Sequence, residues 1–146
     1  MKTMAMTAEN QQQDTSMNGQ TTIHMPMGLM GFEHVKRYVL LSRHDEAPFL
    51  WLQMLDDPNL AFLCVSPLHV SPDYEPDISP ADVESLQLTK PNDALIVSIV
   101  TLHPNGQPTV NLKGPVIINR HTLIGKQVVP CNAAEYASQH RLPLAS

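Results

Sequence analysis

The stretch TVNLKGPVIIN (109–119) has the composition of a strand at both ends, but Gly114-Pro115 interrupts its middle. Proline cannot donate a hydrogen bond to a sheet, so Pro115 belongs at a strand start, an edge or a bulge. We therefore predict two strands joined at a corner where Gly114 permits a sharp bend, as a small barrel requires. Asn111 and Asn119 lie near the ends of the apolar run. We expect their amides to bond backbone groups left unpaired at the corner and at the strand end.

The rest of the chain continues this pattern of short β-favouring runs between turn residues. Val, Ile, Leu and aromatic residues bounded by Pro, Gly, Asn and Asp predict an all-β, barrel-like single domain over residues 21–146. The sequence Pro104-Asn105-Gly106 is typical of a hairpin loop. Besides 108–113 and 115–119, the predicted strands cover 37–42, 49–54, 61–66, 94–102 and 122–129. We expect the inward-facing core to include Trp51, Phe62, Ile96, Val100, Ile117 and Val128.

One short helix is predicted after Ser79. Ser79 is a good N-cap, Pro80 suits the first turn, and Asp82 follows in that turn. A shorter turn is predicted to begin at Asn132. Residues 1–20 are rich in Gln, Asn, Thr, Ser and Met without apolar periodicity, and we expect them to form a disordered polar tail.

Charge is distributed unevenly along the 146 residues. The whole chain carries −5, but residues 45–93 contain ten acidic residues against one lysine. The segment after residue 93 is mildly basic. This polarity suits a basic protein partner and argues against direct nucleic-acid binding. Acidic loops that only keep the protein solvated would give the same pattern, and both interpretations stay open at this point.

No arrangement of residues in the sequence predicts catalysis, a metal or a cofactor. The seven histidines are scattered and no cysteine pair has ligand spacing. Cys64 lies in an apolar run, no G-x-S-x-G turn exposes a serine, and no glycine-rich phosphate loop is present. No apolar run reaches the roughly 18 residues of a membrane span, so we expect a cytoplasmic chain with reduced thiols. A nucleic-acid-binding barrel is the alternative function, and a hydrolase is third.

Six blocks in order resemble the flagellar assembly factor FliW family. They are IHMPMGLMGFE (23–33), RYVLL (37–41), PFLWLQMLDDPNLAFLCVSP (48–67), DYEPDIS (73–79), TVNLKGPVIIN (109–119) and GKQVV (125–129). The resemblance implies a small β-barrel that binds proteins and is not an enzyme. The implied partners are CsrA, the RNA-binding repressor of flagellin translation, and flagellin, which it binds as a chaperone-like partner.

The chain departs from the family pattern at its first strand. TAENQQQDTSMNGQTTI (7–23) stands where family members usually carry a strand with a Phe-Gly pair, so we expect this strand to be short or absent. Met30 replaces the usual proline.

The acidic middle of the chain supplies the candidate partner-binding residues. Asp73, Glu75 and Asp77 lie on a proline-bounded loop, and Asp82 and Glu84 follow on the predicted helix. We expect all five carboxylates to reach solvent and to face CsrA, with Tyr74 as an aromatic anchor.

Overall fold

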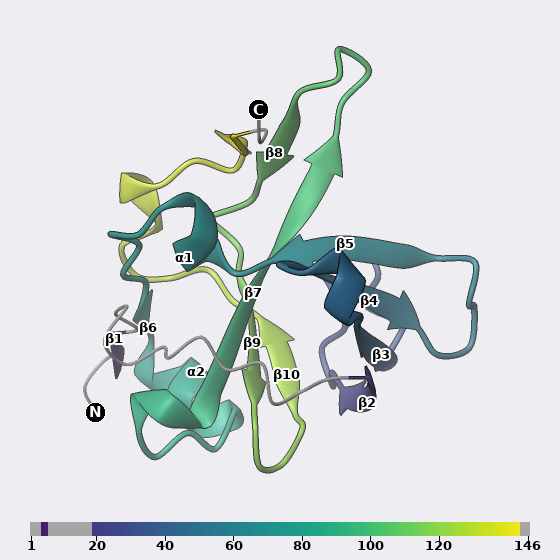
Figure 1. Ribbon diagram of the computed structural model, residues 1–146. Helices are drawn as coiled ribbons and strands as arrows, with labels where there is room; N and C mark the ends of the chain where they lie inside the picture. Colours follow the sequence, from purple (N-terminus) through teal and green to yellow (C-terminus); the bar gives the residue numbers. More distant parts are fainter. Residues whose placement is uncertain (1–3, 6–18, 144–146) are drawn as a thin grey trace.

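The fold is a curved antiparallel sheet, seen in a computed structural model that describes residues 4, 5 and 19–143 (Figure 1). Seven strands follow the order β10-β9-β7-β5-β4-β3-β2, and every neighbouring pair is antiparallel. Their bounds are β2 (Gly19–His24), β3 (Arg37–Ser42), β4 (Phe49–Met54), β5 (Ala61–Val65), β7 (Ala94–Leu102), β9 (Val116–Asn119) and β10 (Gly125–Gln127). The all-β prediction is confirmed.

The two ends of this sheet approach each other without a continuous ladder. One parallel bridge joins His24, at the end of β2, to Ile124, next to β10. The His24 N–H donates to the Leu123 carbonyl at 3.0 Å. The sheet is therefore barrel-like but not closed.

The remaining elements are short. Strand β8 (Pro108–Val110) pairs with β7 and with β11 (His140–Arg141), while β1 (Met4–Ala5) pairs with β6 (Asp77–Ile78). The helices are α1 (Pro67–Val70), which the sequence did not predict, and α2 (Pro80–Ser85). Single 3-10 turns cover His44–Glu46, Pro91–Asp93 and Ala133–Glu135. No helix within the described ranges is long and apolar enough to cross a membrane.

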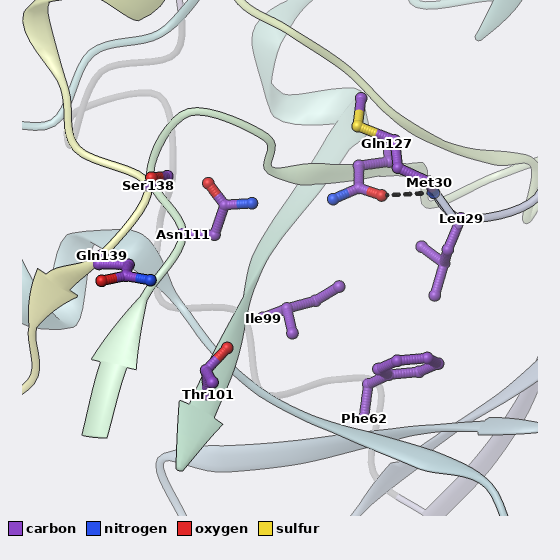
Figure 2. Close-up of a pocket in the computed structure, with 9 residues that line it drawn as sticks. All are labelled: Leu29, Met30, Phe62, Ile99, Thr101, Asn111, Gln127, Ser138 and Gln139. Carbon is purple, nitrogen blue, oxygen red and sulfur yellow. Dashed lines mark hydrogen bonds between the residues drawn. The ribbon is translucent and has the colours of Figure 1, made fainter. Parts of the chain in front are cut away.

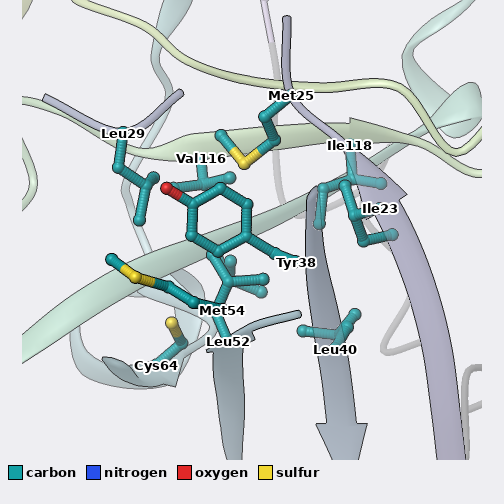
Figure 3. Packing of buried hydrophobic residues seen from close by; sticks show 11 residues of the cluster. Ile23, Met25, Leu29, Tyr38, Leu40, Leu52, Met54, Cys64, Val116 and Ile118 are labelled. Carbon is teal, nitrogen blue, oxygen red and sulfur yellow. The ribbon is translucent and has the colours of Figure 1, made fainter. Parts of the chain in front are cut away.

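The interior of the curved sheet holds the main hydrophobic core, because alternate residues of each strand point inward. Figure 3 shows Tyr38 and Leu40 of β3 packed beside Leu52 of β4, with Val116 and Ile118 of β9 opposite. A second cluster lies between β9 and α2, and a third lies around β8 and α1. The expected core positions Ile96, Val100, Ile117 and Val128 are all buried.

The predicted corner is confirmed. Strand β9 begins directly after Pro115. The side chain of Asn111 accepts hydrogen bonds from the N–H groups of Lys113 (3.0 Å) and Gly114 (3.1 Å). A Cβ at Gly114 would lie 3.2 Å from the Asn111 amide nitrogen and 3.3 Å from that of Gln127, so a larger residue would push these two side chains by a few tenths of an ångström.

One core prediction needs correction. Trp51 is only half-buried and belongs to none of the three clusters. Its neighbours Leu52 and Met54 are buried, so β4 turns Trp51 to the outer face of the sheet. Phe62 is half-buried but faces inward as predicted, since it lies opposite Leu52, packs against the main core and contacts Phe32 edge-to-face with 5.2 Å between the ring centroids.

The amino-terminal boundary is also different from the prediction. Strand β2 begins at Gly19 and forms six pairs with β3, so the strand that we expected to be short or absent is present and starts inside the segment assigned to the tail. Met4 and Ala5 of that segment form β1. The rest of the predicted tail, residues 1–3 and 6–18, lies outside the described residues.

The predicted strand at 122–129 is reduced to Gly125–Gln127. A turn occupies the preceding residues, and Leu123 adopts a positive φ of 61° that a strand does not permit.

Candidate partner-binding surface

The loop between α1 and α2 alternates acidic and apolar residues. Asp73 and Glu75 are exposed, Asp77 is half-buried, and Tyr74, Pro76 and Ile78 between and after them are buried. This period of two is that of a strand, so the carboxylates point outward while the apolar side chains hold the loop to the body of the protein.

Tyr74 is part of the core, which corrects its prediction as an aromatic anchor for CsrA. Its side chain is 1% exposed, and its hydroxyl donates to the Leu112 carbonyl at 2.7 Å. The ring packs edge-on against Tyr136, with 4.6 Å between the centroids. Burial raises the pKa of the Tyr74 phenol well above its ordinary value. Tyr74 therefore anchors the loop to its own chain.

The carboxyl-terminal segment fixes the backbone of the same loop. The Asn132 side chain accepts from the Asp77 N–H (2.9 Å) and donates to the Glu75 carbonyl (2.8 Å). The Tyr136 hydroxyl accepts from the Glu75 N–H at 3.0 Å. The sequence predicted a turn at Asn132 and gave no signal for these contacts, because the partners lie 55 to 61 residues away along the chain.

Helix α2 begins as predicted, with the Ser79 side chain accepting from the Asp82 N–H at 3.1 Å. The Asp82 carboxylate, however, forms an ion pair with Lys126 of β10 at 2.7 Å, and its side chain is 14% exposed. Asp82 is thus turned toward the sheet, contrary to the expectation that it faces solvent. Glu84 lies on the exposed side of the helix.

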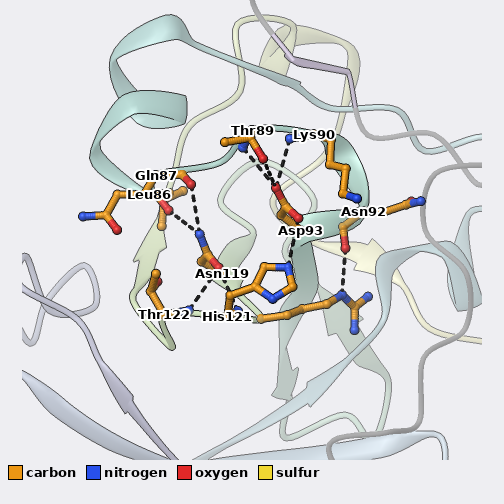
Figure 4. A network of polar contacts seen from close by, with 10 residues as sticks. Leu86, Gln87, Thr89, Lys90, Asn92, Asp93, Asn119, His121 and Thr122 are labelled. Atoms are coloured by element: carbon orange, nitrogen blue, oxygen red, sulfur yellow. Dashed lines mark hydrogen bonds and ion pairs between the residues drawn. The ribbon is translucent and has the colours of Figure 1, made fainter.

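The carboxyl end of α2 is held by Asn119, at the end of β9 (Figure 4). Its amide nitrogen donates to the carbonyls of Leu86 (2.8 Å) and Gln87 (3.2 Å). Its amide oxygen accepts from the N–H groups of His121 (2.8 Å) and Thr122 (3.2 Å). The prediction that Asn119 bonds backbone groups is confirmed.

A buried carboxylate completes this network. Asp93, 4% exposed, accepts from the hydroxyl and N–H of Thr89, from the Lys90 N–H and, at 3.0 Å, contacts Nε2 of His121. The hydrogen bond from the Thr89 hydroxyl is the main reason that the pKa of Asp93 lies well below its ordinary value. These contacts saturate the carboxylate, so Asp93 has a structural role.

We call the exposed carboxylates of Asp73, Glu75 and Glu84, with Asp77 at the margin, the acidic surface. Among the described residues, none of these four carboxylates has an ion-pair partner. Their charge is therefore available to an external cation or a basic protein.

We also searched the described ranges for a metal site and for a reactive thiol. They contain no group of three His, Cys, Asp or Glu that could hold a metal. Complete burial raises the pKa of the Cys64 thiol to about 12, so Cys64 stays protonated at neutral pH.

The surface of the described residues includes two hollows that lie away from this loop. One, of about 330 Å³, is lined by uncharged residues that include Phe62, Ile99 and Asn111 (Figure 2). The other, of about 500 Å³, is lined by apolar and charged residues, Lys36 and Asp57 among them. Neither includes a residue of the acidic surface.

The sequence and the fold of this chain are similar to those of one known protein family. The family described as FliW protein matches residues 6–142. A flagellar assembly factor FliW of Anoxybacillus flavithermus is 42% identical over 116 residues, covering 79% of each chain. Another, of Geotalea uraniireducens, is 36% identical over 119 residues, covering 81% of this chain and 72% of the relative. A crystal structure of the flagellar assembly factor FliW superimposes with a TM-score of 0.75 and 36% identity, covering 82% of this chain and 84% of that one.

Proposed function

Because the chain belongs to the FliW protein family, we propose that it is a flagellar assembly factor that acts by binding other proteins. The first partner in this proposal is CsrA, whose repression of flagellin translation it relieves. The second is flagellin, which it binds as a chaperone-like partner, so that free flagellin competes with CsrA. Its place of action is the cytoplasm, where flagellin is translated.

The observation that carries the CsrA proposal is the acidic surface. A protein that binds RNA presents basic surface, and carboxylates without internal ion pairs attract it. Asp73 and Glu75 supply this charge from a loop whose backbone is held by Asn132 and Tyr136. A surface held in this way loses little conformational entropy when a partner binds.

The positions of Asp82 and Tyr74 in the structure change which residues we propose to contact CsrA. Asp82 is neutralised by Lys126, and Tyr74 is buried, so both support the loop and helix from within. Glu84 extends the acidic surface onto α2.

Charge reversal tests this proposal. The double variant Asp73→Lys/Glu75→Lys should associate more slowly with purified CsrA, and the dependence of its association rate on salt should flatten. Charge steering is screened beyond a Debye length of about 8 Å at physiological ionic strength, so the difference should be largest in low salt. The matched control is Asp45→Lys/Asp57→Lys, which makes the same change of net charge at two exposed residues outside the acidic surface that form no ion pair among the described residues.

If the wild-type protein and the Asp73→Lys/Glu75→Lys variant associate with CsrA at equal rates in low salt, the acidic surface is not part of the CsrA interface. Flagellin added to the preformed complex should release CsrA. An RNA oligomer measured in parallel tests the alternative of a nucleic-acid-binding barrel. Tight RNA binding in the absence of CsrA would favour that alternative.

A further inference from the structure

The strands β5 and β7 separate after a very short ladder. Their register contains only Cys64 with Ile99 and Val65 with Ser98. Beyond this point β7 continues with β8 while β5 stays with β4. Figure 1 shows the two hairpins diverging, with β7 and β8 running toward the top and β4 and β5 toward the right. We call the opening between them the fork.

Backbone groups at the mouth of the fork have no strand to pair with. In an antiparallel sheet, the N–H and C=O of one residue point to the same side, and successive residues alternate. The Leu60 carbonyl accepts from Met54 of β4, so Ala61 turns its groups away from β4 and into the fork. The Ile99 carbonyl accepts from the Asn111 N–H on the β8 side, so Leu102 also turns its groups into the fork.

Neither residue finds another partner. No hydrogen bond joins the backbone of Ala61 or Leu102 to any residue in the described ranges across the fork. Ala61 is exposed, and Leu102 is 71% exposed. The edge of β5 is therefore open to an added strand.

The uncharged hollow of Figure 2 lies on one face of this fork. Phe62 of β5 and Ile99 and Thr101 of β7 line it from the two diverging strands. The nine lining residues include no charged side chain. Charged side chains entering the hollow would lose hydration without gaining a counter-ion, so the lining favours an uncharged occupant.

One amide on the wall of the hollow, that of Asn111, can donate to a peptide backbone, and the neighbouring amide of Gln127 is already used by the fold. The Gln127 side chain accepts from the Met30 N–H (2.9 Å) and donates to the Gly114 carbonyl (2.9 Å). A proline at position 30 has no N–H and could not form the first of these hydrogen bonds. The oxygen of Asn111 is bonded to its own turn, and Figure 2 shows its nitrogen on the side of the hollow. That nitrogen donates to no residue in the described ranges.

We propose that the fork binds an extended, uncharged peptide segment of a partner protein by strand addition to the free edge of β5. The backbone of the segment pairs with Ala61, and one of its apolar side chains packs on Phe62 and Ile99. The amide of Asn111 donates to a carbonyl of the same segment. In this mode, main-chain hydrogen bonds supply affinity and alternate side chains supply selectivity.

The probe is a phage-displayed library of short random peptides, selected on the full-length protein. It contains neither CsrA nor flagellin, so this result is independent of the proposed function. Selected peptides should share alternating apolar positions without charge between them. In a synthetic copy, N-methylation of an amide that faces β5 should abolish binding, while methylation of the next amide along the peptide should not.

Two variants, each with a control, test whether the peptide binds in the fork. Ala61→Pro removes a donor that the fold itself does not use and should weaken the selected peptide about ten-fold, whereas Ala61→Ser should not. Thr101→Lys puts a charge into the hollow and should weaken binding, whereas Thr22→Lys makes the same change on exposed β2 and should not.

Each contrary result overturns the proposal. Such results are the absence of any selected peptide, equal binding by Ala61→Pro and wild type, and no distinction between alternate N-methyl peptides. A concentration-dependent dimer that Ala61→Pro dissociates would assign the β5 edge to a second copy of this chain.

Discussion

Replacing Asn119 with alanine should lower the stability of the protein, because the Asn119 side chain links the end of β9 to the end of α2. Asn119 is 2% exposed and joins β9, its following turn and the end of α2 through four hydrogen bonds. The bond to the Leu86 carbonyl is fully buried, and the variant leaves that carbonyl without a partner. An unpaired buried group costs about 1 to 3 kcal/mol.

The other three hydrogen bonds of Asn119 are partly buried, so in the variant water can bond some of the backbone groups that lose the Asn119 side chain. We therefore expect Asn119→Ala to lower the free energy of unfolding by about 2 to 4 kcal/mol in total. Asn111→Ala is the matched comparison. It removes two partly buried bonds within one turn and should cost about 1 kcal/mol.

Urea unfolding followed by circular dichroism measures both variants against wild type. The midpoint should fall while the slope of free energy against urea stays constant, because the surface exposed on unfolding does not change. An unchanged midpoint for Asn119→Ala, or a larger loss for Asn111→Ala, would refute the assignment of Asn119 as the lock between β9 and α2.

Three further predictions concern the other corrected or buried residues. Hydrogen bonding lowers the pKa of Asp93, so its stabilisation is present above the unfolded value of about 4 and is lost as pH falls toward the folded pKa. Asp93→Asn should flatten the pH dependence of thermal stability below about pH 4. Tyr74→Phe should cost about 1 to 3 kcal/mol in urea unfolding by leaving the Leu112 carbonyl unpaired, with no change in the CsrA association rate. Trp51→Ala should cost about 1 to 2 kcal/mol, less than the roughly 2 to 5 kcal/mol of Leu52→Ala, and a reversed order would restore Trp51 to the core.

The sequence by itself determined the local elements. The bounds of β3, β4 and β7 match the predicted ranges, because β-favouring runs end at turn residues that act over a few positions. The helix at Ser79 and the corner at Pro115 were predictable for the same reason. A cap and a proline constrain the backbone within one turn of themselves. The alternation of acid and apolar residues at 73–78 is also local, although it did not distinguish an anchor for a partner from an anchor to the protein's own core at Tyr74.

Only the tertiary structure decided which face of a strand is inside and which charges are free. Strand β4 is apolar on both faces, so its pattern could not distinguish Trp51 from Leu52. Asp82 is neutralised by a lysine 44 residues away, and the acidic loop is held by Asn132. The fork likewise depends on how long β5 and β7 remain paired. Such contacts form between segments distant in the chain, so their outcome depends on the packing of the whole sheet, which no short stretch of sequence encodes.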